Sequence, residues 1–217
     1  MTNLFQLMRT IAGAGKTIMC SKAISHVLHN RSLNDGKANI VYFFFDFNDI
    51  AKQSVEGMVR SLIYQLVAKA DGVPKTVQDL YSKHQSVPSV ASPPRPEEWQ
   101  KVLIALLQDT GRLFVFVDAL DECAESESQD LLETIQKLFK KGGAHAKWLL
   151  TARPSPRLLS FLQASGFIHS SMEEGAINSD IELHLKVRLE SDTKLSSFGP
   201  KAKEMIISSI TSKSAGM

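Results

Sequence analysis

One stretch near the N-terminus decides the fold: Thr10-Ile11-Ala12-Gly13-Ala14-Gly15-Lys16-Thr17. A short apolar run at residues 4–8 precedes it, and apolar residues with helical spacing follow it. Glycines let backbone N–H groups surround phosphate oxygens, and the N-terminus of the next helix adds partial positive charge there. Lys16 supplies an ammonium group for the β- and γ-phosphates, and Thr17 supplies a hydroxyl for Mg²⁺. The stretch therefore predicts a phosphate-binding loop.

The residues predicted to contact the nucleotide lie in this loop and at the start of the helix after it. They are Ala12, Gly13, Ala14, Gly15, Lys16, Thr17 and Ile18. Thr10 departs from the full pattern, which has glycine there, and its branched side chain stiffens the start of the loop. The alternative interpretation is a glycine-rich turn that only begins a helix. The correctly placed Gly-Lys-Thr triplet favours nucleotide binding.

A second signal is an apolar stretch that ends in acidic residues, Leu113-Phe114-Val115-Phe116-Val117-Asp118-Ala119-Leu120-Asp121-Glu122. A buried strand would hold Asp118 rigidly beside Thr17, where both could bind Mg²⁺. Asp121 and Glu122 follow near the position expected for an attacking water, and Glu122 is the favoured general base. The alternative is that these acids cap the following helix. The glycine loop and the acidic strand end together favour a nucleotide site.

A third motif, Trp148-Leu149-Leu150-Thr151-Ala152-Arg153-Pro154, ends another predicted strand. Ligands gather at the carboxyl ends of the strands in an open parallel sheet. The charge and forked donors of Arg153 suit a γ-phosphate, which makes it a candidate catalytic residue. The alternative is an ordinary surface arginine.

Two further aspartates, Asp46 and Asp49, follow the aromatic stretch at residues 43–45. They either reach the magnesium shell or cap a helix, and capping is the favoured interpretation. Asn48 or Asp49 is expected to begin a long amphipathic helix. Its predicted buried stripe is Val55, Met58, Val59, Leu62, Ile63 and Leu66.

Strand-like and helix-like segments alternate along the chain, which predicts a parallel sheet covered by helices on both faces. Strands are expected at residues 4–8, 39–45, 113–117, 147–151 and 167–172. The predicted fold class is α/β, a three-layer α/β/α sandwich with a mainly parallel central sheet and a short helical C-terminal extension. The expected domains are a nucleotide-binding core at residues 1–175 and a helical extension at residues 176–217.

The composition is that of an ordinary globular protein. Of the 217 residues, 43% are hydrophobic and 22% are charged, and the net charge is +2. This small charge leads us to expect neither nucleic acid nor a membrane as a partner. The two cysteines, Cys20 and Cys123, form no metal-binding or disulfide pattern. No apolar stretch approaches the roughly 18 residues of a membrane span, and no signal peptide is recognised, so a cytoplasmic location is expected.

These motifs, with residues 43–49, closely resemble the NACHT-type NTPase domains of fungal STAND proteins, also described as the nephrocystin-like N-terminal domain. Ala119 after Asp118 matches the variant of the acidic motif in that family, and residues 151–154 resemble its sensor-1 segment. The resemblance implies a P-loop NTPase fold, binding of ATP or GTP with Mg²⁺, and slow hydrolysis. It also implies a nucleotide-governed switch in fungal signalling or self/non-self recognition. Longer relatives continue beyond the position of Met217, so residues 176–217 are expected to begin a truncated C-terminal subdomain.

The motifs allow three functions. The first is a Mg²⁺-dependent triphosphatase acting as a switch. Its expected partners beside the nucleotide are a homo-oligomer or, as in longer relatives, intramolecular regulatory domains. The second is a non-catalytic nucleotide-binding or scaffold fragment, which Thr10 and the missing C-terminal segment favour. The third is a small-molecule P-loop kinase, but the sequence has no arginine cluster for a lid. The switch is ranked first, and turnover is expected to be weak.

Overall fold

The structure, a computed structural model, describes most of the chain. The described residues are 5–9, 15–30, 38–85, 92–143, 145–153, 155–165, 168–171 and 174–214. The first part of the glycine loop, residues 10–14, lies outside this set, as does Pro154.

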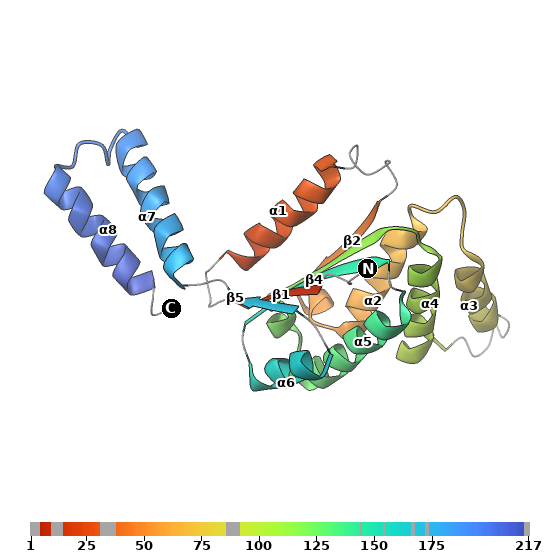
Figure 1. Cartoon of the computed structure of the whole chain (residues 1–217). Coiled ribbons are helices and arrows are strands. Elements are labelled where there is room, and N and C mark those ends of the chain that lie inside the picture. Colours follow the sequence, from red (N-terminus) through yellow and green to blue (C-terminus); the bar gives the residue numbers. More distant parts are fainter. Residues whose placement is uncertain are drawn as a thin grey trace.

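A sheet of five parallel strands forms the centre of the molecule (Figure 1). Its strands are β1 (Phe5–Arg9), β2 (Asn39–Phe44), β3 (Leu113–Asp118), β4 (Ala146–Ala152) and β5 (Ile168–Ser171). They lie in the order β2-β3-β4-β1-β5. The strand before the glycine loop, β1, is therefore separated by β4 from β3, the strand that ends in Asp118.

Helices cover both faces of this sheet, with α1 (Lys16–His29) on one face (Figure 1). The other face carries α2 (Val55–Val67), α4 (Pro96–Asp109), α5 (Ser128–Lys141) and α6 (Pro156–Ser165). The helix α3 (Lys75–Gln85) packs against α4. Short 3-10 helices lie at Ile50–Lys52 (η2), Leu120–Glu122 (η3) and Glu125–Glu127 (η4). The predicted α/β/α sandwich with a parallel sheet is confirmed.

The C-terminal extension consists of α7 (Glu174–Ser191) and α8 (Pro200–Ser214). These helices pack against each other and lie away from the sheet (Figure 1). A domain boundary at residue 175 stays a prediction. Among the helices described, none combines the length and the apolar character that a membrane span requires.

The main core lies between the sheet and α2, α4 and α5. All six residues of the predicted α2 stripe are buried. The start of that helix differs from the prediction: Ser54, and not Asn48 or Asp49, is the N-cap, and its side chain accepts a hydrogen bond from Gly57 N. On the opposite face, Cys20 and Ile24 of α1 pack against Ile40 and Phe116.

Replacing Leu103, which is fully buried in α4, with alanine is expected to lower the free energy of unfolding by about 2–5 kcal/mol. The loss combines the lost transfer free energy of the side chain with the cost of the cavity that remains. Urea denaturation measures the effect. The same change at Leu183, whose side chain is 63% exposed on α7, is the control and is expected to shift stability by no more than about 0.5 kcal/mol. Equal effects at both positions would contradict the assigned core.

Candidate functional site

The carboxyl ends of β3 and β4 meet the N-terminus of α1 at one edge of the sheet. Thr17 on α1 donates a hydrogen bond from Oγ1 to Asp118 Oδ2 at the end of β3, over 2.6 Å. These residues are 101 positions apart in the sequence. Their contact follows from topology, because parallel strands place all their carboxyl ends, and the helices that follow them, along one edge.

The N-terminus of α1 is suited to an anion. Gly15 is its N-cap with φ 77°, in the left-handed region where only glycine is unstrained. The first turn contains no acidic residue, so no side chain there offsets the positive end of the helix dipole. Lys16 and Thr17 open the helix, whereas the Ile18 side chain is exposed. Thr10, Ala12, Gly13 and Ala14 lie outside the described residues.

Asp118 is almost completely buried, and both of its carboxylate oxygens accept hydrogen bonds from hydroxyls. Thr17 bonds Oδ2, and Thr151 at the end of β4 bonds Oδ1 over 2.5 Å. A buried carboxylate requires such donors or a cation. Thr151 is a residue that the sequence reasoning placed at the strand end but gave no role.

The donor set fits Mg²⁺. Thr17 and Asp118 offer oxygen ligands, which this ion prefers, and Mg²⁺ bound with a nucleotide commonly uses one or two protein oxygens beside phosphates and waters. Within the part of the chain that the structure describes, no group of three or more His, Cys, Asp or Glu side chains could hold a metal ion.

The chain turns sharply directly after Asp118. Ala119 has φ 57° and ψ 51°, and it is the one non-glycine with positive φ among the described residues. This conformation costs about 1–2 kcal/mol for an L-residue. Two hydrogen bonds hold it: Ala119 N donates to Thr151 Oγ1 over 2.9 Å, and Glu122 N donates to Ala119 O over 2.9 Å. The turn fixes where Asp121 and Glu122 lie.

Arg153 is tied to this acidic loop. Its backbone N donates to Asp121 Oδ1 over 2.8 Å, and its Nε lies 3.0 Å from Asp121 Oδ2. Its Nη2 lies 3.9 Å from Glu122 Oε1. Glu122 Oε2 also accepts a hydrogen bond from Phe47 N in the loop after β2, over 3.3 Å. The structure thus brings Asp121, Glu122 and Arg153 together, and their catalytic roles stay predictions.

The loop after β2 has its own capping contacts. Asp49 accepts a hydrogen bond from Ala51 N and caps η2, as the capping interpretation predicted. Asp46 accepts from Asn48 N over 2.9 Å, which closes a turn. Gln53, which the sequence reasoning overlooked, donates from Nε2 to Phe47 O over 2.6 Å. Among the hydrogen bonds of the described residues, those of both aspartates stay within this loop and do not reach Asp118 or Thr17.

The two cysteines are poor nucleophiles. Burial, with a smaller contribution from the charge of Asp118, raises the pKa of the Cys20 thiol to about 12. Burial likewise raises the pKa of Cys123 to about 11. Both thiols therefore stay protonated at neutral pH and act as small apolar side chains.

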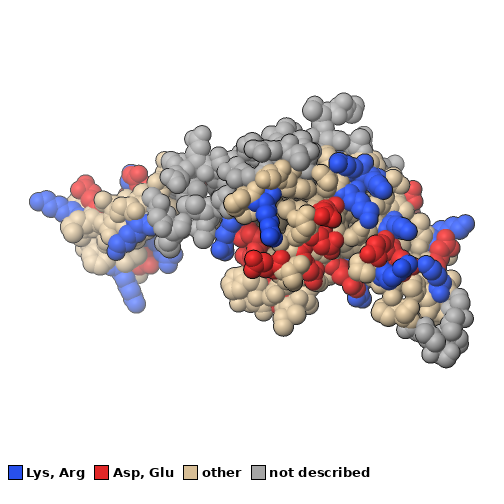
Figure 2. Space-filling model, turned by 90° about the horizontal axis from the view of Figure 1, so that it is seen from below, with Lys and Arg blue, Asp and Glu red and all other residues tan. Residues whose placement is uncertain are grey.

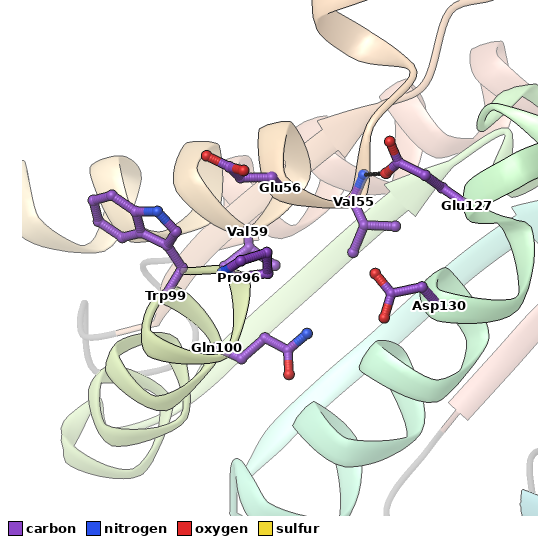
Figure 3. Close-up of a pocket in the computed structure, with 8 residues that line it drawn as sticks. All are labelled: Val55, Glu56, Val59, Pro96, Trp99, Gln100, Glu127 and Asp130. Atoms are coloured by element: carbon purple, nitrogen blue, oxygen red, sulfur yellow. Dashed lines mark hydrogen bonds between the residues drawn. The ribbon is translucent and has the colours of Figure 1, made fainter. Parts of the chain in front are cut away.

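A cavity of about 170 Å³ lies between α2, α4 and α5, and its lining is acidic, in contrast to the N-terminus of α1 (Figure 3). Trp99 and the carboxylates of Glu56, Glu127 and Asp130 line it. Glu127 accepts a hydrogen bond from Val55 N, which caps α2 (Figure 3). Burial and then the charges of Glu127 and neighbouring glutamates raise the pKa of Asp130. Acidic side chains gather near the middle of this helical face (Figure 2), and such an environment repels phosphate. The N-terminus of α1 is therefore a better site for an anion than this acidic cavity.

Comparison with known proteins gives one family. A model of the family described as Nephrocystin 3, N-terminal, matches residues 3–153, which include the first two motifs and the third as far as Arg153. A search among proteins with curated functions finds no significant match.

Several solved structures are similar to this chain at low identity. Cdc6p from Pyrobaculum aerophilum is 14% identical with a TM-score of 0.46; the match covers 86% of this chain and 43% of that chain. Orc1 from Aeropyrum pernix in complex with DNA is 12% identical with a TM-score of 0.49, over 86% of this chain and 44% of that one. Drosophila ORC bound to DNA is 15% identical with a TM-score of 0.42, over 78% of this chain and 81% of that one. The chain thus spans less than half the length of Cdc6p and of Orc1.

The sequence-based exclusion of nucleic acid as a partner was wrong. Structures that this chain resembles are complexes with DNA. The error has a physical reason: a net charge of +2 is a sum over the whole chain and does not describe local surfaces.

Proposed function

Because the chain belongs to the Nephrocystin 3, N-terminal family, we propose that it binds a nucleoside triphosphate, with ATP the first candidate, together with Mg²⁺, and hydrolyses it slowly. The observation that carries the proposal is the hydrogen bond between Thr17 and Asp118 at the N-terminus of α1. It joins the two motifs that a phosphate-binding site needs. The resemblance to fungal STAND proteins supports a switch role in signalling or self/non-self recognition, and a cytoplasmic location belongs to the same proposal.

Each residue of the site has a separate task in binding. Lys16 neutralises the β- and γ-phosphates beside the positive end of α1. Thr17 and Asp118 would hold Mg²⁺, and the ion would offset the negative charge of the phosphates. The burial of Asp118 strengthens its interaction with a cation, because water screens the charge little there.

Hydrolysis is assigned to the acidic loop and the end of β4. Glu122 orients the attacking water and accepts its proton as general base. Arg153 contacts the γ-phosphate and stabilises the charge that develops on it. Asp121 holds the Arg153 guanidinium through its Nε and fixes the backbone of the same residue.

One observation favours a second candidate, a nucleotide-binding module without turnover. One carboxylate oxygen of Glu122 accepts a hydrogen bond from Phe47 N, and the other lies near Arg153. Arg153 in turn forms an ion pair with Asp121. If these contacts persist with nucleotide bound, both groups are held away from the γ-phosphate.

Affinity for ATP is expected to rise at least about tenfold when excess Mg²⁺ replaces EDTA, and Asp118→Asn is expected to abolish most of this gain. A charge-assisted contact contributes about 1.5–3 kcal/mol, which corresponds to about 10–100-fold in affinity. Isothermal titration with ATP and with GTP measures binding, and phosphate release measures turnover.

The control is Asp180→Asn, a change at an exposed position of α7 that is expected to leave the Mg²⁺ dependence intact. Binding with no phosphate release would select the non-catalytic module. Failure of the purified chain to bind either nucleotide would overturn the proposal.

A further inference from the structure

The hydroxyl of Thr151 joins two strand ends. It lies at the carboxyl end of β4, and the Thr151 side chain is completely buried. Its Oγ1 donates to Asp118 Oδ1 over 2.5 Å and accepts from Ala119 N over 2.9 Å. Since a hydroxyl has one proton to donate, these contacts have a fixed direction: the Ala119 amide donates to Thr151, and Thr151 donates to Asp118.

We propose that Thr151 is a positioning residue for magnesium, acting through Asp118 without touching the ion or the nucleotide. The inference rests on the proposed function. The terminal torsion of an aspartate has broad minima, so an unrestrained carboxylate can rotate. The Thr151 hydroxyl donates a hydrogen bond to Asp118 Oδ1 from the β4 side, so that Asp118 Oδ2 is directed at Thr17 on α1. The oxygen assigned to the ion therefore has one fixed position.

The order of the strands makes this arrangement specific. β4 lies between β1 and β3 and pairs with both in parallel, with Met8 of β1 opposite Thr151. Thr151 therefore stands between the strand that leads into the glycine loop and the strand that carries Asp118. From this position the Thr151 hydroxyl holds the Asp118 carboxylate.

The same hydroxyl has a second task. Ala119 is buried, its backbone is left-handed, and its amide has Thr151 Oγ1 as acceptor. This turn directs the chain into η3, where Asp121 and Glu122 lie. Thr151 thus links the metal carboxylate to the start of the acidic loop, while Arg153, two residues further, binds that loop directly.

The test compares Thr151→Val, which keeps the branched shape and removes the hydroxyl, with Thr151→Ser, which keeps the hydroxyl. ATP binding is titrated with Mg²⁺ and, separately, in EDTA. Thr151→Val is expected to bind ATP in EDTA as the wild type does. It is expected to need at least about tenfold more Mg²⁺ to reach half of the increase in ATP affinity that Mg²⁺ produces. Thr151→Ser is expected to stay within about threefold of the wild type.

A second substitution separates the two tasks. Ala119→Gly removes the penalty of the left-handed turn, so it is expected to return part of the thermal stability lost in Thr151→Val without restoring the wild-type Mg²⁺ requirement. If Thr151→Val alone does not fold, the comparison is made within the Ala119→Gly background. A purely structural role predicts the opposite result, in which regained stability also restores the Mg²⁺ dependence.

The outcomes distinguish this inference from the function on which it rests. An unchanged Mg²⁺ requirement in Thr151→Val, with wild-type binding intact, would overturn the inference alone. A wild-type chain that binds neither ATP nor GTP would overturn both the inference and the proposed function.

Discussion

Replacing Lys16 with alanine is expected to weaken the binding of ATP with Mg²⁺ by at least about 100-fold. Lys16 is the first residue of α1, directly after the left-handed Gly15. Its ammonium group would donate charged hydrogen bonds to two phosphates, each contributing about 1.5–3 kcal/mol. Their sum of at least about 3 kcal/mol corresponds to two orders of magnitude in affinity. Isothermal titration with ATP measures the change, and circular dichroism shows that the variant is folded.

Lys22→Ala is the matched control. Lys22 is an exposed residue of the same helix, and its replacement removes the same charge. Since exposed charges are screened by water and salt, the control is expected to change affinity by less than about threefold. Equal losses in the two variants would mean that general charge, and not a phosphate contact of Lys16, governs binding.

The placement of Thr17 and Asp118 at the same edge could be predicted from the sequence, because a parallel sheet brings the carboxyl ends of its strands to one edge. The order of the strands could not. β1, β3 and β4 are all short apolar stretches, and nothing in their residues shows that β4 lies between the other two. The role of Thr151 follows from this order alone, so the hydroxyl could be placed at a strand end but not assigned to Asp118.

The helices show the same distinction between pattern and context. The buried stripe of α2 was predicted correctly because six apolar residues recur at helical spacing. Its start was predicted wrongly because Asp49 and Ser54 are both good caps, and Asp49 caps the short η2 instead. The helix α3 was not predicted, since none of its residues is buried and its apolar residues are few.

The pairing within the acidic loop depends on side-chain geometry that no spacing rule gives. Asp121 and Arg153 lie 32 residues apart, and each was predicted only to stand near the phosphates. Their contact arises because the left-handed turn at Ala119 directs η3 toward the end of β4. The sequence does not predict that turn, because alanine rarely adopts the left-handed conformation.

Replacing Glu122 with glutamine is expected to lower the rate of ATP hydrolysis by about 100-fold or more, with ATP affinity changed by less than about threefold. A positioned general base contributes about 10²–10⁴-fold to a rate, and an amide cannot accept the proton. Glutamine keeps the shape of the side chain, and its carbonyl oxygen can still accept the hydrogen bond from Phe47 N. Single-turnover phosphate release measures the rate, and Glu125→Gln, an exposed neighbour in η4, is the control.

The geometry also argues for Glu122 over Asp121 as the base. Both Asp121 oxygens are engaged by Arg153, one by its backbone N at 2.8 Å and one by Nε at 3.0 Å. A water that approached Asp121 would have to compete with these two arginine contacts for the carboxylate oxygens. Glu122 Oε1 lies 3.9 Å from Arg153 and is less restrained. If Glu122→Gln turned over at the wild-type rate while Asp121→Asn did not, the base would be Asp121, and Arg153 would have to leave it before each hydrolysis.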